Sequence, residues 1–263
     1  MKVLDSFRLD GRVAIITGGA GRYGKQMVSA LAEAGATVYV ASRGMEALEA
    51  VAAELRDGGM KVFAHSLDLG SQESMDALVK DVADKEGGID ILVNNAVTRC
   101  GCGNGWLKPM DSYDESLHVN ASAMFYLTAA VAEVMKPKRR GSIINIGSMM
   151  GLVGIEMGNY EGTEMGKNPN PIYFYEKGGM VNFTRWAASI LGPYQIRVNC
   201  IHPGGLYEPH LPEAFVKNYS ARTQLGRMAN QEDLKGVVVF LASDASAYLT
   251  GTNIPVDGGY TAK

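Results

Sequence analysis

Tyr173 and Lys177 are the two side chains in this sequence whose types and spacing could move a proton. They lie four residues apart, so in a helix both project from one face. An isolated tyrosine has a pKa of about 10 and is a poor base at neutral pH, but a neighbouring ammonium favours the phenolate form. The pair predicts a general acid/base. A bare Tyr-x-x-x-Lys spacing also occurs as ordinary helix structure, so other residues must support this interpretation.

Two polar residues could complete such a site. Ser148 follows the apolar run 142–146, and a hydroxyl at the end of a strand can hold a substrate oxygen. Asn120 lies within a long helical segment and could hold a water that relays protons beyond the lysine. A further polar segment, NNA at 94–96, follows another apolar run and is expected to brace the centre of a sheet.

A glycine-rich segment, TGGAGRYG at 17–24, joins the first apolar run to the first helical segment. Glycines allow a tight turn and a close approach of the backbone to a pyrophosphate, and the helix N-terminus offers free N–H groups to it. Between a strand and a helix the segment predicts dinucleotide binding. The alternative interpretation is a plain strand-to-helix turn.

Ser42-Arg43 ends the second apolar run, where dinucleotide-binding folds often carry an acid for the ribose 2′-hydroxyl. No carboxylate stands there to repel a 2′-phosphate, and a guanidinium could pair with one. Arg22 adds positive charge nearby. NADP(H) is therefore the favoured cofactor and NAD(H) the alternative; in a third interpretation, Arg43 is only a solvated start to the next helix.

The elements that must position these residues alternate along the chain. Strands are predicted at 12–17, 37–41, 61–67, 90–94, 142–146, 196–201 and 253–256, and helices at 25–34, 46–56, 72–85, 112–135 (one helix or two), 181–190 and 232–243. Continuously apolar strands between helices predict one α/β domain over 1–263, a doubly wound parallel sheet of about seven strands covered on both faces. The irregular stretches 152–171 and 204–223 follow strand ends, where such sheets bind ligands.

The composition excludes several functions. A net charge of −3 over 263 residues gives no field for nucleic acid or a membrane surface. No apolar run is long enough to span a bilayer and the N-terminus lacks a signal-peptide pattern, so the cytoplasm is expected. The odd cysteine count (Cys100, Cys102, Cys200) argues against a disulfide framework. The scattered histidines (His65, His118, His202, His210) show no metal spacing, so no metal site is predicted.

Together these segments resemble the classical short-chain dehydrogenase/reductase (SDR) family over 12–260. The matching pieces, in family order, are TGGAGRYG, Asp68-Leu69, NNA, VN at 119–120, Ser148, YFYEK at 173–177, IRVNCIHPGG at 196–205 and IPVDGGY at 254–260. The resemblance implies a single-domain Rossmann fold, a homotetramer, and NAD(P)-dependent interconversion of a secondary alcohol and a ketone.

The resemblance also implies roles for individual residues. Tyr173 would transfer the proton, Lys177 would assist it and bind the nicotinamide ribose, and Ser148 would orient the substrate oxygen. The proton relay would include Asn120. Asp68 and Leu69 would flank the adenine, Asn94 would lie along the cofactor ribose, and Pro203 and Gly204 would shape the nicotinamide pocket. The expected cofactor contacts also include Gly18, Gly21, Arg22, Tyr23, Gly24, Ser42, Arg43, Asn95 and Ala96.

Four departures from the family pattern stand out. Arg22 takes the place of the middle glycine, with a glycine displaced to Gly21; Val97 follows NNA where glycine is usual; and Gly147 precedes the serine where a second serine is common. The fourth is an insertion, 149–172, between Ser148 and Tyr173. Because these two side chains must still meet, the insertion is expected to loop outward over the pocket.

Polar residues in the insertion and the later loop predict a polyol, sugar or sugar-acid substrate. The expected substrate contacts are Ser148, Tyr160, Tyr207 and His210. The methionines of the insertion favour the alternative, a more apolar ketone of 3-oxoacyl or steroid-like type. A cofactor-binding sensor without turnover is the alternative from another functional class. An epimerase or dehydratase of the extended relatives would need a larger C-terminal substrate domain.

Overall fold

The computed structural model describes residues 2–99, 106, 109–166 and 169–262. Cys100 and Cys102 lie outside these described residues. The chain alternates strands and helices around one parallel sheet, in the order β3-β2-β1-β4-β5-β6-β7. The strands are β1 Val13–Thr17, β2 Thr37–Ser42, β3 Val62–Ser66, β4 Ile91–Asn94, β5 Gly141–Ile146, β6 Ile196–Pro203 and β7 Asn253–Val256. This arrangement confirms the predicted single-domain Rossmann fold.

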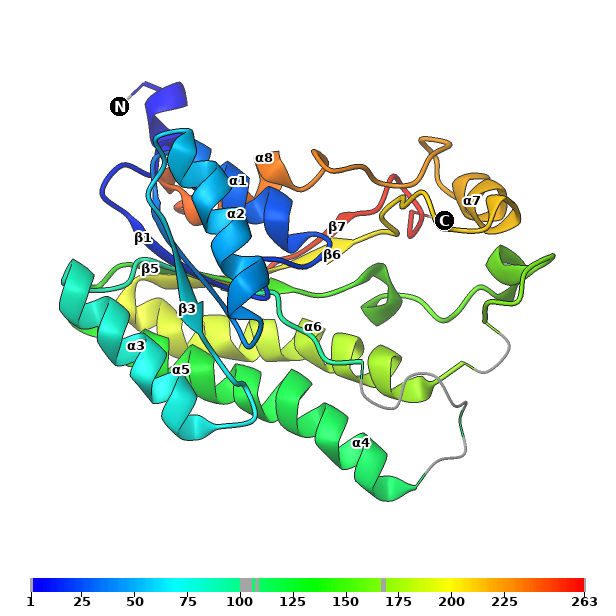
Figure 1. Ribbon diagram of the computed structural model, residues 1–263, viewed down its shortest axis with the longest axis horizontal. Helices are drawn as coiled ribbons and strands as arrows, with labels where there is room; N and C mark the ends of the chain where they lie inside the picture. Colours follow the sequence, from blue (N-terminus) through cyan, green and yellow to red (C-terminus); the bar gives the residue numbers. More distant parts are fainter. Residues whose placement is uncertain (1, 100–105, 107–108, 167–168, 263) are drawn as a thin grey trace.

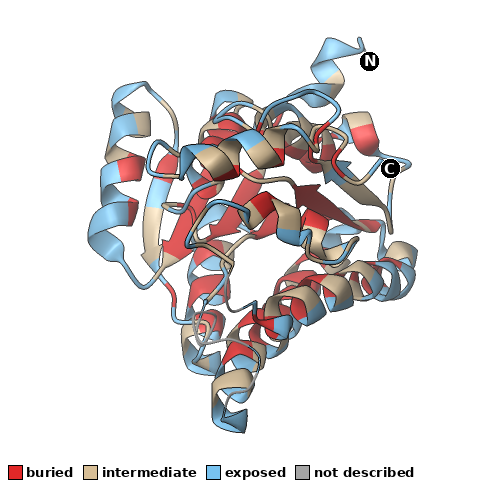
Figure 2. Ribbon diagram, turned by 90° about the vertical axis from the view of Figure 1, so that its right-hand side faces the viewer, coloured by how far each residue is buried: buried red, intermediate tan, exposed pale blue. Residues whose placement is uncertain are grey.

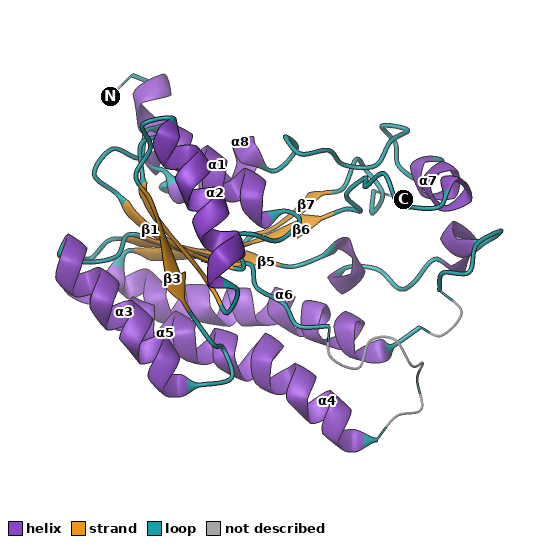
Figure 3. Ribbon diagram, in the orientation of Figure 1, coloured by secondary structure: helices purple, strands orange, loops and turns teal. Residues whose placement is uncertain are grey.

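Helices cover both faces of the sheet (Figures 1 and 3). One face carries α1 Gly24–Glu33, α2 Met45–Asp57 and α8 Lys235–Ala242. The other face carries α3 Gln72–Glu86, α4 Met110–Leu117, α5 Ala123–Met135 and α6 Pro171–Leu191. The short helix α7 Glu213–Ser220 lies beyond the end of the sheet, beside the insertion.

The two faces bury two separate cores because successive strand residues point to opposite sides. On β1, Ile16 packs with Val28 of α1, whereas the adjacent Ile15 packs with Leu127 of α5. Figure 2 shows the result, buried strands between helices whose outer surfaces are exposed. Strands such as β1 are apolar at almost every position because helices cover both faces of the sheet.

The structure completes two helical predictions, 112–135 and 181–190, and corrects the prediction for 204–223. The segment 112–135 is two helices, α4 and α5, joined by a π-helical turn at His118–Ser122. The stretch 204–223, predicted to be irregular, contains α7. The helix predicted at 181–190 already begins at Pro171, because the Asn170 side chain accepts a hydrogen bond from the Ile172 N–H and proline suits the first turn.

Asp90 fastens the start of the sheet. Its side chain is buried, accepts a hydrogen bond from the Val13 N–H at 2.9 Å and pairs with the Arg140 guanidinium at 2.5 Å. One carboxylate thus links the beginnings of β1 and β5 on either side of β4.

We expect Asp90→Ala to lower the free energy of unfolding by about 2 kcal/mol, because it leaves a buried N–H without an acceptor and a guanidinium without its counter-ion. The measurement is the urea unfolding midpoint. Asp84→Asn, which breaks an exposed pair with Lys80, is the control and should leave the midpoint unchanged. Equal midpoints for the two variants would contradict this account of Asp90.

Candidate active site and cofactor pocket

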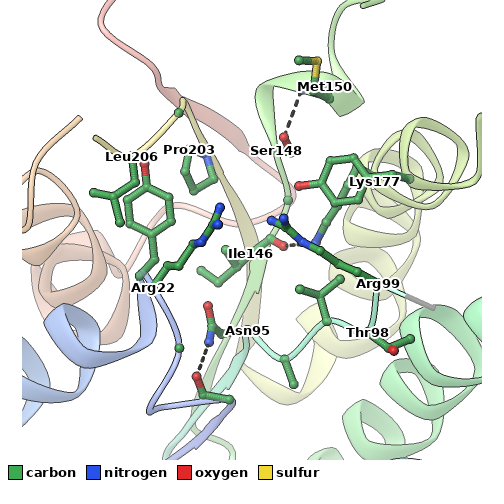
Figure 4. Close-up of a pocket in the computed structure, with 18 of the residues that line it drawn as sticks. Arg22, Asn95, Thr98, Arg99, Ile146, Ser148, Met150, Lys177, Pro203 and Leu206 are labelled. Carbon is green, nitrogen blue, oxygen red and sulfur yellow. Dashed lines mark hydrogen bonds between the residues drawn. The ribbon is translucent and has the colours of Figure 1, made fainter. Parts of the chain in front are cut away.

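A large pocket of about 1120 Å³ opens where the strands end, and most of the predicted site residues line it (Figure 4). Its lining runs from the glycine turn and the end of β2 to the ends of β5 and β6 and the first turn of α6. Pockets for one small molecule have volumes of about 300–1,000 Å³, so this one has room for a dinucleotide together with a small substrate. It lies beside the boundary between β1 and β4, where the strand order reverses.

The glycine turn leaves a concave backbone surface that suits a diphosphate. Side chains in place of its glycines would collide with the neighbouring backbone. Gly18 has φ +69°, a conformation that favours glycine, and a Cβ there would lie 2.9 Å from the Ala96 Cα. A Cβ on Gly24 would lie 2.4 Å from the Gly18 carbonyl oxygen. Gly24 itself does not line the pocket; its role is to let the first turn of α1 close onto the loop. The resulting concave backbone at a helix N-terminus suits an anion.

Thr17 and Asn95 join the two halves of the sheet at this point. The Thr17 hydroxyl accepts hydrogen bonds from the backbone N–H groups of Asn95 and Ala96 at 3.1 and 3.0 Å. In return the Asn95 amide donates to the carbonyls of Thr17 and Gly18 at 2.9 and 3.0 Å. Asn95 therefore ties the glycine turn to the end of β4 (Figure 4).

Where β2 and β3 end, the pocket is lined by four further residues, Ser42, Arg43, Asp68 and Leu69. The Asp68 carboxylate accepts a hydrogen bond from the Gly70 N–H at 2.9 Å, which fixes its turn. The second cation, Arg22, is already engaged, since its Nε lies 3.0 Å from Glu208 Oε2. Arg43 forms no ion pair with any described residue.

Tyr173, Lys177 and Ser148 meet at the end of β5. Lys177 Nζ donates a hydrogen bond to the Ile146 carbonyl at 2.7 Å and lies 5.8 Å from the centre of the Tyr173 ring. Burial lowers the pKa of Lys177 to about 8. Ser148 caps the short helix that follows it, its Oγ accepting from the Met150 N–H at 3.1 Å. All three side chains line the pocket, as do Pro203 and Gly204.

Asn94 and Asn120 lie outside the large pocket. Asn94 is buried, and its amide donates to Thr128 Oγ1 at 3.0 Å and to Asn145 Oδ1 at 2.9 Å, so its side chain is used to brace the sheet. The Asn120 side chain accepts a hydrogen bond from the Thr98 N–H and donates one to the Thr98 carbonyl. Both asparagines line a second cavity of about 20 Å³ beneath Lys177. The contact between Asn94 and the cofactor ribose stays a prediction.

The insertion and α7 form the remaining wall. Tyr160 of the insertion packs on Phe215 of α7, with ring centres 5.4 Å apart, and both line the pocket. The expectation that the insertion covers the pocket agrees with this placement. Figure 1 shows the insertion and α7 on the same side of the molecule, beyond the strand ends.

Tyr207 and His210 do not line the pocket. The Tyr207 N–H donates to the Ala229 carbonyl at 2.8 Å, and this extended pairing turns Leu206 inward, so that its neighbour Tyr207 faces outward. The His210 side chain is 68% exposed and lies 3.9 Å from Glu208. Sequence reasoning placed these two residues by loop membership alone, which does not resolve which side a residue faces.

Several lining residues were not singled out from the sequence. Phe215 and Tyr219 lie four residues apart on α7, a spacing that could have revealed a helical face. Arg99 lines the pocket and points towards its centre near Lys177 (Figure 4), although no sequence signal marked it. Glu176, next to Lys177, lines the small cavity.

Among the described residues, no three acidic, histidine or cysteine side chains are grouped so that they could hold a metal ion. No described helix combines the length and the apolar character that crossing a bilayer requires.

We expect Gly24→Ala to weaken NADPH binding by more than about tenfold, because the new Cβ meets backbone atoms that cannot turn away. Quenching or enhancement of nicotinamide fluorescence measures the affinity. Gly236→Ala is the control: its Cβ meets nothing within 4 Å, so it should bind NADPH as the wild type does. Equal affinities in both variants would show that the closed turn is not needed for binding.

Comparison with known proteins agrees with this geometry. A family model described as enoyl-(acyl carrier protein) reductase matches residues 22–261. The 3-oxoacyl-[acyl-carrier-protein] reductase FabG of Thermotoga maritima is 34% identical over 259 residues, 96% of this chain and 98% of that protein. Cyclopentanol dehydrogenase of Comamonas sp. is 33% identical over 266 residues, 97% of this chain and 99% of that protein.

Among solved structures, a gluconate 5-dehydrogenase from Burkholderia cenocepacia in complex with NADP and tartrate superimposes with a TM-score of 0.86. The two chains are 30% identical, and the match covers 100% of each. The resemblance first seen in the sequence motifs is confirmed by these matches. This chain belongs to the short-chain dehydrogenase/reductase family and is an oxidoreductase that acts on CH–OH groups with NAD(P).

Proposed function

We propose that this enzyme interconverts a secondary alcohol and a ketone on a mainly apolar carbon frame, with NADP(H) as cofactor. One observation carries the substrate class: the pocket beside Ser148 and Tyr173 is walled by methionine and aromatic side chains. These are Met149, Met150, Tyr160, Met165, Phe174, Phe215 and Tyr219. All of them except Phe174 belong to, or pack against, one hydrophobic cluster that includes Tyr260, and the Tyr219 and Tyr260 rings stack at 5.0 Å.

The lining favours the apolar ketone over the polyol. Of the acidic residues that predicted a hydroxyl-rich ligand, Glu156 lies outside the pocket lining, 3.7 Å from Arg222. Methionines adapt their shape to irregular apolar ligands, and aromatic rings stack on flat or cyclic ones. A compact cyclic ketone fits such a wall better than a chain of hydroxyls, because each buried hydroxyl would need its own partner.

Asn159 adds one polar point to this wall. It is fully buried and lines the pocket, and its Nδ2 donates to the Tyr260 hydroxyl at 2.7 Å. Its Oδ1 has no hydrogen-bond partner among the described residues. A substrate with a second polar group, distant from the reacting carbon, would satisfy this amide.

Each step of the proposed reaction has a residue that could carry it out. The bound cofactor supplies or accepts the hydride. Ser148 holds the substrate oxygen, and Tyr173 gives it a proton during reduction or takes one during oxidation. The Lys177 ammonium, placed by its bond to Ile146, favours the phenolate that Tyr173 becomes in the reductive direction.

The preference for NADP(H) is assigned to Arg43. Arg43 lines the pocket beside Ser42 and is not engaged by a carboxylate of the described residues, whereas Arg22 is paired with Glu208. The solved gluconate 5-dehydrogenase, which is similar along its whole length, was crystallised with NADP. Arg43 is thus the cation available for a 2′-phosphate.

We expect Arg43→Ala to weaken NADPH binding by about tenfold and to leave NADH binding unchanged, since a charge-assisted pair contributes about 1.5–3 kcal/mol and only NADPH carries the extra phosphate. Separate fluorescence titrations of the two cofactors measure this. Lys61→Ala is a control for the loss of one positive charge. Equal losses for NADPH and NADH would show that Arg43 does not read the 2′-phosphate.

The function is tested by NADPH oxidation with a panel of cyclic ketones, 3-oxoacyl thioesters and keto-sugars. We expect turnover of cyclic ketones, and a loss of about 10²–10⁴-fold in Tyr173→Phe with NADPH affinity retained, because the variant lacks only the transferable proton. Turnover of keto-sugars alone would contradict the apolar substrate. Turnover of no carbonyl, with NADPH still bound, would favour a sensor.

We also propose a cytoplasmic homo-oligomer, a tetramer by family resemblance. The outer faces of α5 and α6 support self-association because they carry exposed aromatic side chains: Phe125 is 46% and Trp186 is 59% exposed. Phe183 bridges them, with ring centres 4.6 Å from Phe125 and 6.0 Å from Trp186. A continuous apolar surface of this kind suits a self-complementary contact.

A further inference from the structure

Glu176 is a buried acid that the reaction described above does not use. It precedes Lys177 on α6 and is 8% exposed. One carboxylate oxygen accepts from the Ser116 hydroxyl at 2.7 Å and the other from the Asn120 amide at 2.9 Å. No lysine or arginine of the described residues forms an ion pair with it. A buried carboxylate with only neutral donors is costly, so its presence calls for a cation close by.

The small cavity of about 20 Å³ shows where that cation lies. Asn120, Glu176 and Lys177 all line it, and Asn94 closes another side. The cavity has room for about one water molecule, to which Asn94, Asn120, Glu176 and Lys177 offer polar partners. Lys177 therefore has the substrate pocket on one side and the Glu176–Asn120 cluster on the other.

Several groups near Lys177 change its pKa. Burial lowers the pKa of the ammonium most strongly; Cys200 and then Glu176 raise it, and Arg99 lowers it. Cys200, on β6, is itself a neutral thiol near pH 7, because burial raises its pKa to about 12. Tyr173 presents its ring to Lys177 at 5.8 Å. Glu176 is then the carboxylate that lines the same small cavity as Lys177.

We propose that Glu176 is a positioning residue of the proton-transfer site, which fixes the Asn120 amide and supplies the counter-charge that keeps Lys177 an ammonium. The inference rests on the proposed function, in which the ammonium assists Tyr173. Asn120 is held from two sides: Glu176 accepts from its amide nitrogen, and the Thr98 N–H donates to its oxygen at 2.8 Å. The π-helical turn at His118–Ser122 places Asn120 between these partners.

The test is Glu176→Gln, which keeps the shape and both hydrogen bonds, since the Ser116 hydroxyl can accept from the new amide. The titration midpoint of Lys177 is followed in the cofactor-free protein by NMR of 13Cε-labelled lysine, and the signal is assigned by its loss in Lys177→Met. Without the counter-charge the ammonium is less stable, so the midpoint should fall by about one pH unit. The pH above which ketone reduction declines should fall by the same amount.

Two controls isolate the charge. Asp114→Asn removes one exposed carboxylate from α4 and should move neither the midpoint nor the pH profile. Ser116→Ala removes a hydrogen bond to Glu176 but keeps its charge, and should leave the midpoint near the wild-type value. A merely structural Glu176 would give the opposite pattern, with stability changed and the midpoint unmoved.

An unchanged Lys177 midpoint in Glu176→Gln would overturn the inference, even if turnover falls. A lowered midpoint in a protein that reduces no carbonyl would support the counter-charge and refute the proposed function. Should Glu176→Gln fail to fold, Glu176→Ala gives the same comparison, because the Asn120 amide keeps the Thr98 carbonyl as an acceptor at 3.0 Å.

Discussion

The hydrogen bonds between Thr17 and Asn95 are the constraint on which the pocket depends. They hold the ends of β1 and β4 together where the strand order reverses, although these residues lie 78 positions apart in the chain. Because the two ends are held together, the glycine turn is pressed against Ala96, and only glycine fits at Gly18. The anion-binding backbone is thus produced by long-range pairing, with the turn sequence adapted to it.

The catalytic end depends on a second long-range contact. Lys177 reaches back from α6 to the last carbonyl of β5, so one buried hydrogen bond places both the ammonium and the helix that carries Tyr173. The insertion can be long without separating Ser148 from Tyr173, because β5 and α6 are positioned by the sheet and the insertion only has to leave and return. The insertion's own packing is against α7.

The sheet and the pocket residues that belong to sequence motifs could be predicted from the sequence. Apolar strands such as β4 and β5 are buried at every position, which is a strong signal, and the glycine turn, Ser148, Tyr173 and Lys177 were all predicted at the pocket they line. A motif gives a position in the chain but not the direction of a side chain, and the Asn94 side chain points into the sheet, where it bonds Thr128 and Asn145. The same limit explains why Tyr207 was placed in the pocket.

Other features could not be read from the sequence because they arise from tertiary contacts. The π-helical turn holds Asn120, which bonds the distant Thr98, and the pairing of Arg22 with Glu208 joins segments 186 residues apart. Glutamate is usually a surface residue, and Glu176 is buried because α4 packs against α6. Charged side chains whose partners are distant in the chain give no local signal.

The pairing of Arg22 with Glu208 links two walls of the pocket. Arg22 belongs to the glycine turn, and Glu208 belongs to the segment that follows β6 and leads into α7, whose rings line the pocket. The glycine turn and the wall formed by α7 are therefore mechanically coupled, so that a displacement of one segment is transmitted to the other.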